Sequence, residues 1–68
     1  MKVVIIGSGG REHALCYEIK KSEKVEKIYC IPGNAGTHYI AENIDLDVSN
    51  FALIKKFINE NKIDIVII

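Results

Sequence analysis

The sequence predicts an α/β protein built on a parallel, doubly wound sheet. Three observations lead to this prediction. Short apolar runs rich in β-branched residues alternate with segments of helical period. The runs at residues 2–6 and 63–68 are almost wholly apolar, with consecutive rather than alternating apolar positions, which is typical of parallel strands covered on both faces. Turn-forming residues separate the runs, so strands and helices alternate as in βαβ units.

Two strands and one helix are expected in the first half of the chain. Lys2–Ile6 forms the first strand, and a helix follows from Arg11 to about Lys21. Leu15 and Ile19 are spaced to lie on the buried face of this helix. The second strand covers Lys27–Ile31 and ends where a proline removes a ladder N–H group.

The second half is predicted to add two strands and a helix. Ile44–Val48 alternates apolar and acidic residues, which favours a short edge strand. Ser49 is expected to cap a helix that has Phe51 on its apolar stripe and stops near Asn61. Ile63–Ile68 is almost wholly apolar and is expected to be a central strand. Right-handed crossovers with one switch of direction then give the strand order 3-2-1-4.

Composition restricts the class of protein. The chain has 68 residues, 49% hydrophobic and 26% charged, as expected for one small globular domain. Nine basic and nine acidic residues cancel, so charge gives no reason to expect nucleic acid or a membrane as a partner. No targeting signal or membrane span is visible, which makes a cytoplasmic location the default. Cys16 and Cys30 have no metal-ligand or redox spacing and are expected to be reduced core residues.

The most informative stretch follows the first strand, and we call it the glycine loop: Gly7, Ser8, Gly9, Gly10, Arg11, Glu12 and His13. A strand, a tight turn and a helix N-terminus direct backbone N–H groups and the positive end of the helix dipole at an anion. Arg11 and His13 oppose that dipole by about 0.3–1 kcal/mol each, and a bound anion would reverse the sign. Glu12 suits the dipole and could accept a hydrogen bond from a sugar hydroxyl or an amine.

Three interpretations of the glycine loop stay open: a turn without a ligand, a dinucleotide site, and a site for phosphate or another small anion. Dinucleotides are disfavoured because Glu12 stands where G-x-G-x-x-G requires its third glycine. The second strand also lacks the terminal carboxylate that holds a ribose. The Walker A pattern fails because no Lys-Ser or Lys-Thr follows the glycines.

A second loop, Pro32–Thr37, leaves the neighbouring strand at the same edge of the predicted sheet. Its residues Gly33 and Gly36 could bring backbone N–H groups to the other side of the same ligand, and Asn34 could bring an amide. Thr37–Asn43 gives a weak signal for a helical turn.

Residues Met1–Leu15 resemble the opening of the phosphoribosylamine–glycine ligase family, also called the glycinamide ribonucleotide synthetases. Pro32–Thr37 resembles a second motif of that family at the right distance. Lys62–Ile68 is similar to the strand that precedes the family's next glycine-containing loop. The resemblance covers essentially the whole chain, and the two loop motifs together make it specific.

The resemblance implies a Rossmann-like, pre-ATP-grasp domain of an ATP-grasp enzyme in purine biosynthesis. Such an enzyme uses ATP and Mg²⁺ or Mn²⁺ to activate glycine as an acyl phosphate, which the amine of 5-phosphoribosylamine then attacks. By position, the glycine loop would line the ribose-phosphate side of the substrate, with Gly33, Asn34 and Gly36 nearby. The nucleotide pocket and metal ligands are expected outside residues 1–68, which would contain no catalytic or metal-binding residue.

The chain stops within its most apolar strand, so we expect it to be the first part of a larger protein whose other domains are its partners. Alone it is expected to be catalytically inactive and to fold poorly, because its last strand is partly uncovered. Two other functions stay open: a free-standing module that binds a sugar phosphate or nucleotide, and a fragment of a Rossmann-type oxidoreductase.

Overall fold

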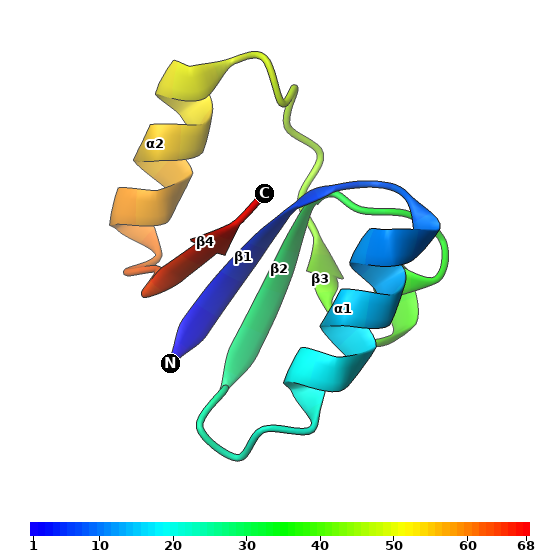
Figure 1. The fold of residues 1–68 in the computed structure, drawn as a ribbon. Helices are drawn as coiled ribbons and strands as arrows, with labels where there is room; N and C mark the ends of the chain where they lie inside the picture. Colours follow the sequence, from blue (N-terminus) through cyan, green and yellow to red (C-terminus); the bar gives the residue numbers. More distant parts are fainter.

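The computed structural model describes residues 1–68 and has a four-stranded parallel sheet with two helices. The elements are β1 (Lys2–Gly7), α1 (Gly10–Lys20), β2 (Lys27–Pro32), the 3₁₀ turn η1 (Thr37–Tyr39), β3 (Glu42–Asn43), α2 (Phe51–Glu60) and β4 (Ile65–Ile67). The strand order is β3-β2-β1-β4, so the predicted fold class and order are confirmed. Figure 1 shows α1 and α2 on either side of the sheet.

β1 and β2 run side by side over their whole length and end together. Lys2 pairs with Lys27 at one end of the ladder, and Gly7 pairs with Pro32 at the other. The Gly33 N–H donates a hydrogen bond to the Gly7 carbonyl (3.1 Å), one step beyond the last pair. The loops after the two strands therefore leave next to each other at the carboxyl edge, where open α/β sheets bind ligands.

The face of the sheet under α1 holds the first part of the core. Val3 and Ile5 of β1 pack with Cys30 of β2 and Cys16 of α1, and none of the four is more than 2% exposed. Neither cysteine is in a disulfide. Burial raises the pKa of both thiols, and the pKa of Cys30 reaches about 12 with the Cys16 thiol adding to the rise. The prediction of two reduced core residues is confirmed.

The opposite face of the sheet packs against α2. Val4, Tyr29 and Ile31 form the buried cluster there, and Phe57 of α2 lies against it. The ring centroids of Tyr29 and Phe57 are 5.0 Å apart with the rings at 87°. This edge-to-face geometry contributes about 0.5–1.5 kcal/mol beyond the burial of the rings. Because the two faces of β1 are both covered, its side chains are apolar at consecutive positions.

The structure corrects two expectations about helix faces. In α1 the buried residue is Cys16, whereas Leu15 is 38% exposed. The innermost position of α1 therefore holds a small side chain against the central strands, and Leu15 turns toward the β4 side near Ile67. In α2 Ile54 is buried, but Phe51, expected on the apolar stripe, is 78% exposed and borders an open apolar groove between α2 and β4.

The third strand is shorter and earlier than predicted. β3 has two residues, and the predicted strand at Ile44–Val48 has no strand pairing. The Ile44 N–H still donates to the Cys30 carbonyl (2.8 Å), after which the chain leaves β2. Ile44 and Leu46 pack against the cluster under α2. The alternating pattern of Ile44–Val48 therefore reflects side-chain packing without a strand ladder. The helical turn weakly predicted within Thr37–Asn43 corresponds to η1.

The N-cap of α2 is Asn50, so the prediction of Ser49 is wrong. The Asn50 Oδ1 accepts a hydrogen bond from the Leu53 N–H (3.2 Å). Ser49 is not free to cap the helix because its N–H and its hydroxyl both donate to the Asp47 carboxylate, at 2.9 and 2.7 Å. α2 ends before Asn61, as predicted.

Within residues 1–68 β4 lies at the edge of the sheet, as the confirmed order 3-2-1-4 requires, so the separate expectation of a buried, central strand is not met. It pairs with β1 alone. Its residues Ile65 and Val66 are 41% and 40% exposed because no other strand of the chain lies beyond them. Neither helix of the structure has the length and apolar character needed to cross a membrane.

Candidate functional site

The glycine loop and the second loop meet at the carboxyl edge of the sheet, where β1 and β2 end (Figure 1). α1 begins at Gly10, and Gly9 precedes it in an extended conformation. The N–H groups of Gly10 and Arg11 lie in the first helical turn, where no intrahelical acceptor is available to them. These donors and the positive end of the α1 dipole form the kind of surface that binds anions.

Glu12 turns back into the glycine loop. Its Oε2 accepts a hydrogen bond from the Gly9 N–H (3.0 Å), as the carboxylate of a helix capping box does. Gly7 has a φ of +150°, and a Cβ atom added there would collide with the Glu12 side chain. Gly7 is therefore required both by its backbone conformation and by the approach of Glu12.

The side chain of Asn34 joins the two loops. Its Nδ2 donates to the carbonyls of Ser8 (2.8 Å) and Gly9 (3.1 Å), and its Oδ1 accepts from the Thr37 N–H (2.9 Å). We call the two Nδ2 bonds the loop clasp. The sequence predicts an amide directed at a ligand, whereas the structure directs it at the glycine loop.

Two residues outside the predicted set hold Asn34 in place. The hydroxyl of Thr37, a fully buried residue, accepts from the Asn34 N–H (2.7 Å). Asn43 on β3 donates through Nδ2 to the Asn34 carbonyl (2.8 Å), and its Oδ1 lies 2.8 Å from the Thr37 hydroxyl. The sequence gives little sign of this network because Thr and Asn in a turn are ordinarily solvated.

Arg11 and His13 of the glycine loop differ in their surroundings. His13 reaches the second loop, where a Cβ atom added to Gly36 would lie 3.0 Å from the imidazole Nδ1 and Cε1. Arg11 is exposed and takes part in none of the four ion pairs of the chain. Arg11 therefore lies in the first turn of α1 without an internal counter-ion.

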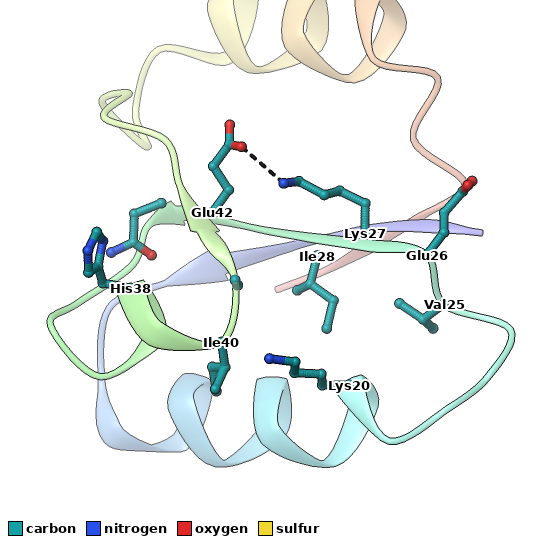
Figure 2. Close-up of a pocket in the computed structure, with 10 residues that line it drawn as sticks. Lys20, Val25, Glu26, Lys27, Ile28, His38, Ile40 and Glu42 are labelled. Atoms are coloured by element: carbon teal, nitrogen blue, oxygen red, sulfur yellow. Dashed lines mark hydrogen bonds and ion pairs between the residues drawn. The ribbon is translucent and has the colours of Figure 1, made fainter.

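The larger cavities lie away from both loops. One of about 620 Å³ follows the β3 edge, and Figure 2 shows Lys20, Ile28 and Ile40 turned toward it. The Lys27 ammonium, at its border, is paired with the Glu42 carboxylate at 3.0 Å. A second, largely apolar groove of about 500 Å³ lies between α2 and β4. The candidate site is thus an open surface, and nowhere in residues 1–68 do three or more His, Cys, Asp or Glu side chains gather as metal ligands.

Comparison of the sequence with known proteins shows which family the chain belongs to. The family described as phosphoribosylglycinamide synthetase, N domain, matches residues 1–68. The chain belongs to this family. Membership confirms the resemblance predicted from the two loop motifs.

Relatives of this N domain include enzymes of purine biosynthesis. The chain is 48% identical over 68 residues to the phosphoribosylamine–glycine ligase of Caldanaerobacter subterraneus subsp. tengcongensis, covering 100% of the chain and 16% of that protein. It is 46% identical over 66 residues to the ligase of the same name from Rhodopirellula baltica, covering 97% of the chain and 15% of the relative. It is 42% identical over 72 residues to the trifunctional purine biosynthetic protein adenosine-3 of Drosophila melanogaster, covering 98% of the chain and 5% of the relative.

Proposed function

We propose that these 68 residues are the phosphoribosyl-binding part of an ATP-dependent ligase that joins glycine to 5-phosphoribosylamine and yields glycinamide ribonucleotide. One observation carries the proposal: two loops are clasped together at the carboxyl ends of β1 and β2, beside a helix N-terminus with an unpaired arginine. Membership of the N-domain family supports the choice of reaction.

The chain's own residues would bind and orient the sugar phosphate. The N–H groups of Gly10 and Arg11 donate to phosphate oxygens, and the α1 dipole stabilises the anion by about 0.3–1 kcal/mol. The Arg11 guanidinium adds a charge-assisted hydrogen bond. The proposed substrate-binding set is Gly7, Ser8, Gly9, Gly10, Arg11, Glu12, His13, Gly33 and Gly36, and Asn34 of the predicted set would contribute through its bonds to the glycine loop.

ATP and Mg²⁺ or Mn²⁺ are proposed to bind to segments that the relatives carry beyond the matched region, within an ATP-grasp domain. ATP would supply activation of glycine as glycyl phosphate there. The 68 residues alone are proposed to lack ligase activity, and the whole enzyme is proposed to be cytoplasmic.

A chimera tests the ligase proposal. The matched segment of the Caldanaerobacter ligase is replaced by this chain, which shares 48% of its residues. The chimera is expected to release ADP only when glycine and 5-phosphoribosylamine are both present. An Arg11→Ala chimera is expected to show a raised KM for 5-phosphoribosylamine with little change in the KM for glycine. A folded chimera that binds ATP but forms no glycinamide ribonucleotide would contradict the proposal.

A binding experiment on the 68-residue chain separates the other two functions. Ribose 5-phosphate is expected to raise the melting temperature, whereas ribose without phosphate is not. Stabilisation by NAD alone would favour an oxidoreductase fragment. Stabilisation by ATP without an effect of ribose 5-phosphate would favour a nucleotide-binding module.

A further inference from the structure

We infer that Asn34 is a positioning residue, which orients the glycine loop for anion binding without touching the ligand. This inference rests on the proposed function and concerns the same site. Both N–H donors of the Asn34 amide are used by the Ser8 and Gly9 carbonyls, and its oxygen accepts from the Thr37 N–H. An amide has two donors and one acceptor oxygen, so no donor remains for a ligand.

The planarity of the peptide bond explains how Asn34 acts at a distance. In a trans peptide the carbonyl of one residue and the N–H of the next point in opposite directions. When Asn34 holds the Ser8 and Gly9 carbonyls on its side, the N–H groups of Gly9 and Gly10 must face the other side. The Gly9 N–H already meets a carboxylate there, since it donates to Glu12. The side of the turn away from Asn34 is therefore the side that accepts negative charge.

Asn34 can orient the loop because it is held firmly itself. Its N–H donates to the hydroxyl of Thr37, a fully buried residue, and its carbonyl accepts from Asn43 of β3. The backbone just before Asn34 is also anchored, because the Gly33 N–H donates a hydrogen bond to the Gly7 carbonyl (3.1 Å). Through Asn34 and its bond from Asn43, the clasp ties the glycine loop to β3.

The chemistry of the clasp requires asparagine. Aspartate has the same shape, but its carboxylate would place a negative oxygen near 2.8 and 3.1 Å from two carbonyl oxygens that now accept hydrogen bonds. Asn34→Asp should therefore open the clasp without changing side-chain volume. Asn50 provides the matched control because it uses only its Oδ1, as the α2 cap. Aspartate caps helices as well as asparagine does.

The experiment compares Asn34→Asp and Asn50→Asp in the 68-residue chain by NMR, with ribose 5-phosphate as the titrant. Losing two hydrogen bonds should weaken binding to Asn34→Asp about tenfold at pH 7.5. Asn50→Asp should bind like the unmodified chain. Below the ordinary Asp pKa of about 3.9, most of the introduced carboxyl is protonated and can donate one of the two lost bonds. The ratio of the two affinities, each measured at the same pH, should therefore fall as the pH is lowered toward that value.

Signals of the ligand-free chain distinguish failure of this inference from failure of the proposed function. In Asn34→Asp the carbonyl carbons of Ser8 and Gly9 and the amide of Gly10 should shift, while β-sheet signals stay in place. Unchanged loop signals, or unchanged affinity, would overturn the positioning role. A third outcome is possible, in which the unmodified chain does not bind ribose 5-phosphate but Asn34→Asp shifts the glycine-loop signals as described. The proposed function then fails, and the role of Asn34 in orienting the loop stands. Should Asn34→Asp not fold, Asn34→Ala, which keeps the backbone bonds, gives the same comparison without the pH recovery.

Discussion

Replacing Gly33 with alanine should test how strongly the second loop depends on its backbone conformation. Gly33 has a φ of +75°, in the left-handed region, where a Cβ atom costs about 1–2 kcal/mol. The added Cβ would also collide with the Asn43 amide and lie 2.8 Å from the Thr37 hydroxyl. Asn43 must then move, which breaks its bonds to the Asn34 carbonyl and to Thr37.

The magnitude of this effect follows from those contacts. Two lost hydrogen bonds cost about 0.5–1.5 kcal/mol each. Together with the backbone cost, Gly33→Ala should lower the free energy of unfolding by about 2–5 kcal/mol. For a chain of 68 residues the whole free energy of unfolding is expected to be roughly 3–10 kcal/mol. The substitution should therefore remove a large part of the stability.

Gly10→Ala provides the control with the same chemical change. No atom lies within 4 Å of a Cβ added to Gly10, and α1 begins there. Alanine in a helix is favoured over glycine by up to about 1 kcal/mol. Urea unfolding followed by circular dichroism measures both variants. With a slope of about 1 kcal/mol per M, the midpoint should fall by 2 M or more for Gly33→Ala and stay or rise for Gly10→Ala. Equal midpoints would refute the reasoning.

Three further predictions concern α2, the loop before it and the core. Asn50→Ala should lower the free energy of unfolding by about 1 kcal/mol in urea titration, because the α2 cap is lost, and Asn50→Asp should not. Hydrogen bonds from Ser49 hold the pKa of Asp47 below its ordinary value. They therefore stabilise the folded chain fully at a pH above the ordinary pKa, and this stabilisation is lost as the pH falls through the lowered pKa of the folded state. The stability difference between the unmodified chain and Ser49→Ala should thus shrink in acid, and a difference constant down to pH 2 would contradict this. Because burial raises the pKa of Cys30 to about 12, iodoacetamide at pH 8 should alkylate its thiol only after urea unfolding, as mass spectrometry can show.

Much of the sheet is predictable because its signals are local. The consecutive apolar residues of β1 indicate burial on both faces, and the two clusters under α1 and α2 explain that pattern. The glycine loop is recognisable because a strand, glycines and a helix follow one another without interruption. Strand order then follows from handedness rules that hold for most parallel sheets.

Features set by contacts between distant residues are not predictable in this way. The spacing of Ile44–Val48 describes which side chains face the core, but the Asn43 bonds to the second loop decide where β3 lies. Ser49 and Asn50 are equally good caps by type, and the Asp47 carboxylate decides between them. Asparagine is an ordinary residue type in a turn, so the sequence does not predict that Asn34 bonds to Ser8 and Gly9, and only the structure shows these bonds.

The central position of β1 has a consequence for the order in which the chain can assemble. The bonds that β1 and the glycine loop make with the rest of the chain close loops of very different length. Asn34 reaches the Ser8 carbonyl across 26 residues, whereas the Lys2 N–H reaches the Asp64 carboxylate across 62. Closing the longer loop costs about 0.8 kcal/mol more chain entropy. Every contact of the clasp and its support lies between Ser8 and Asn43, so the binding surface can form during synthesis before α2 and β4 have been made.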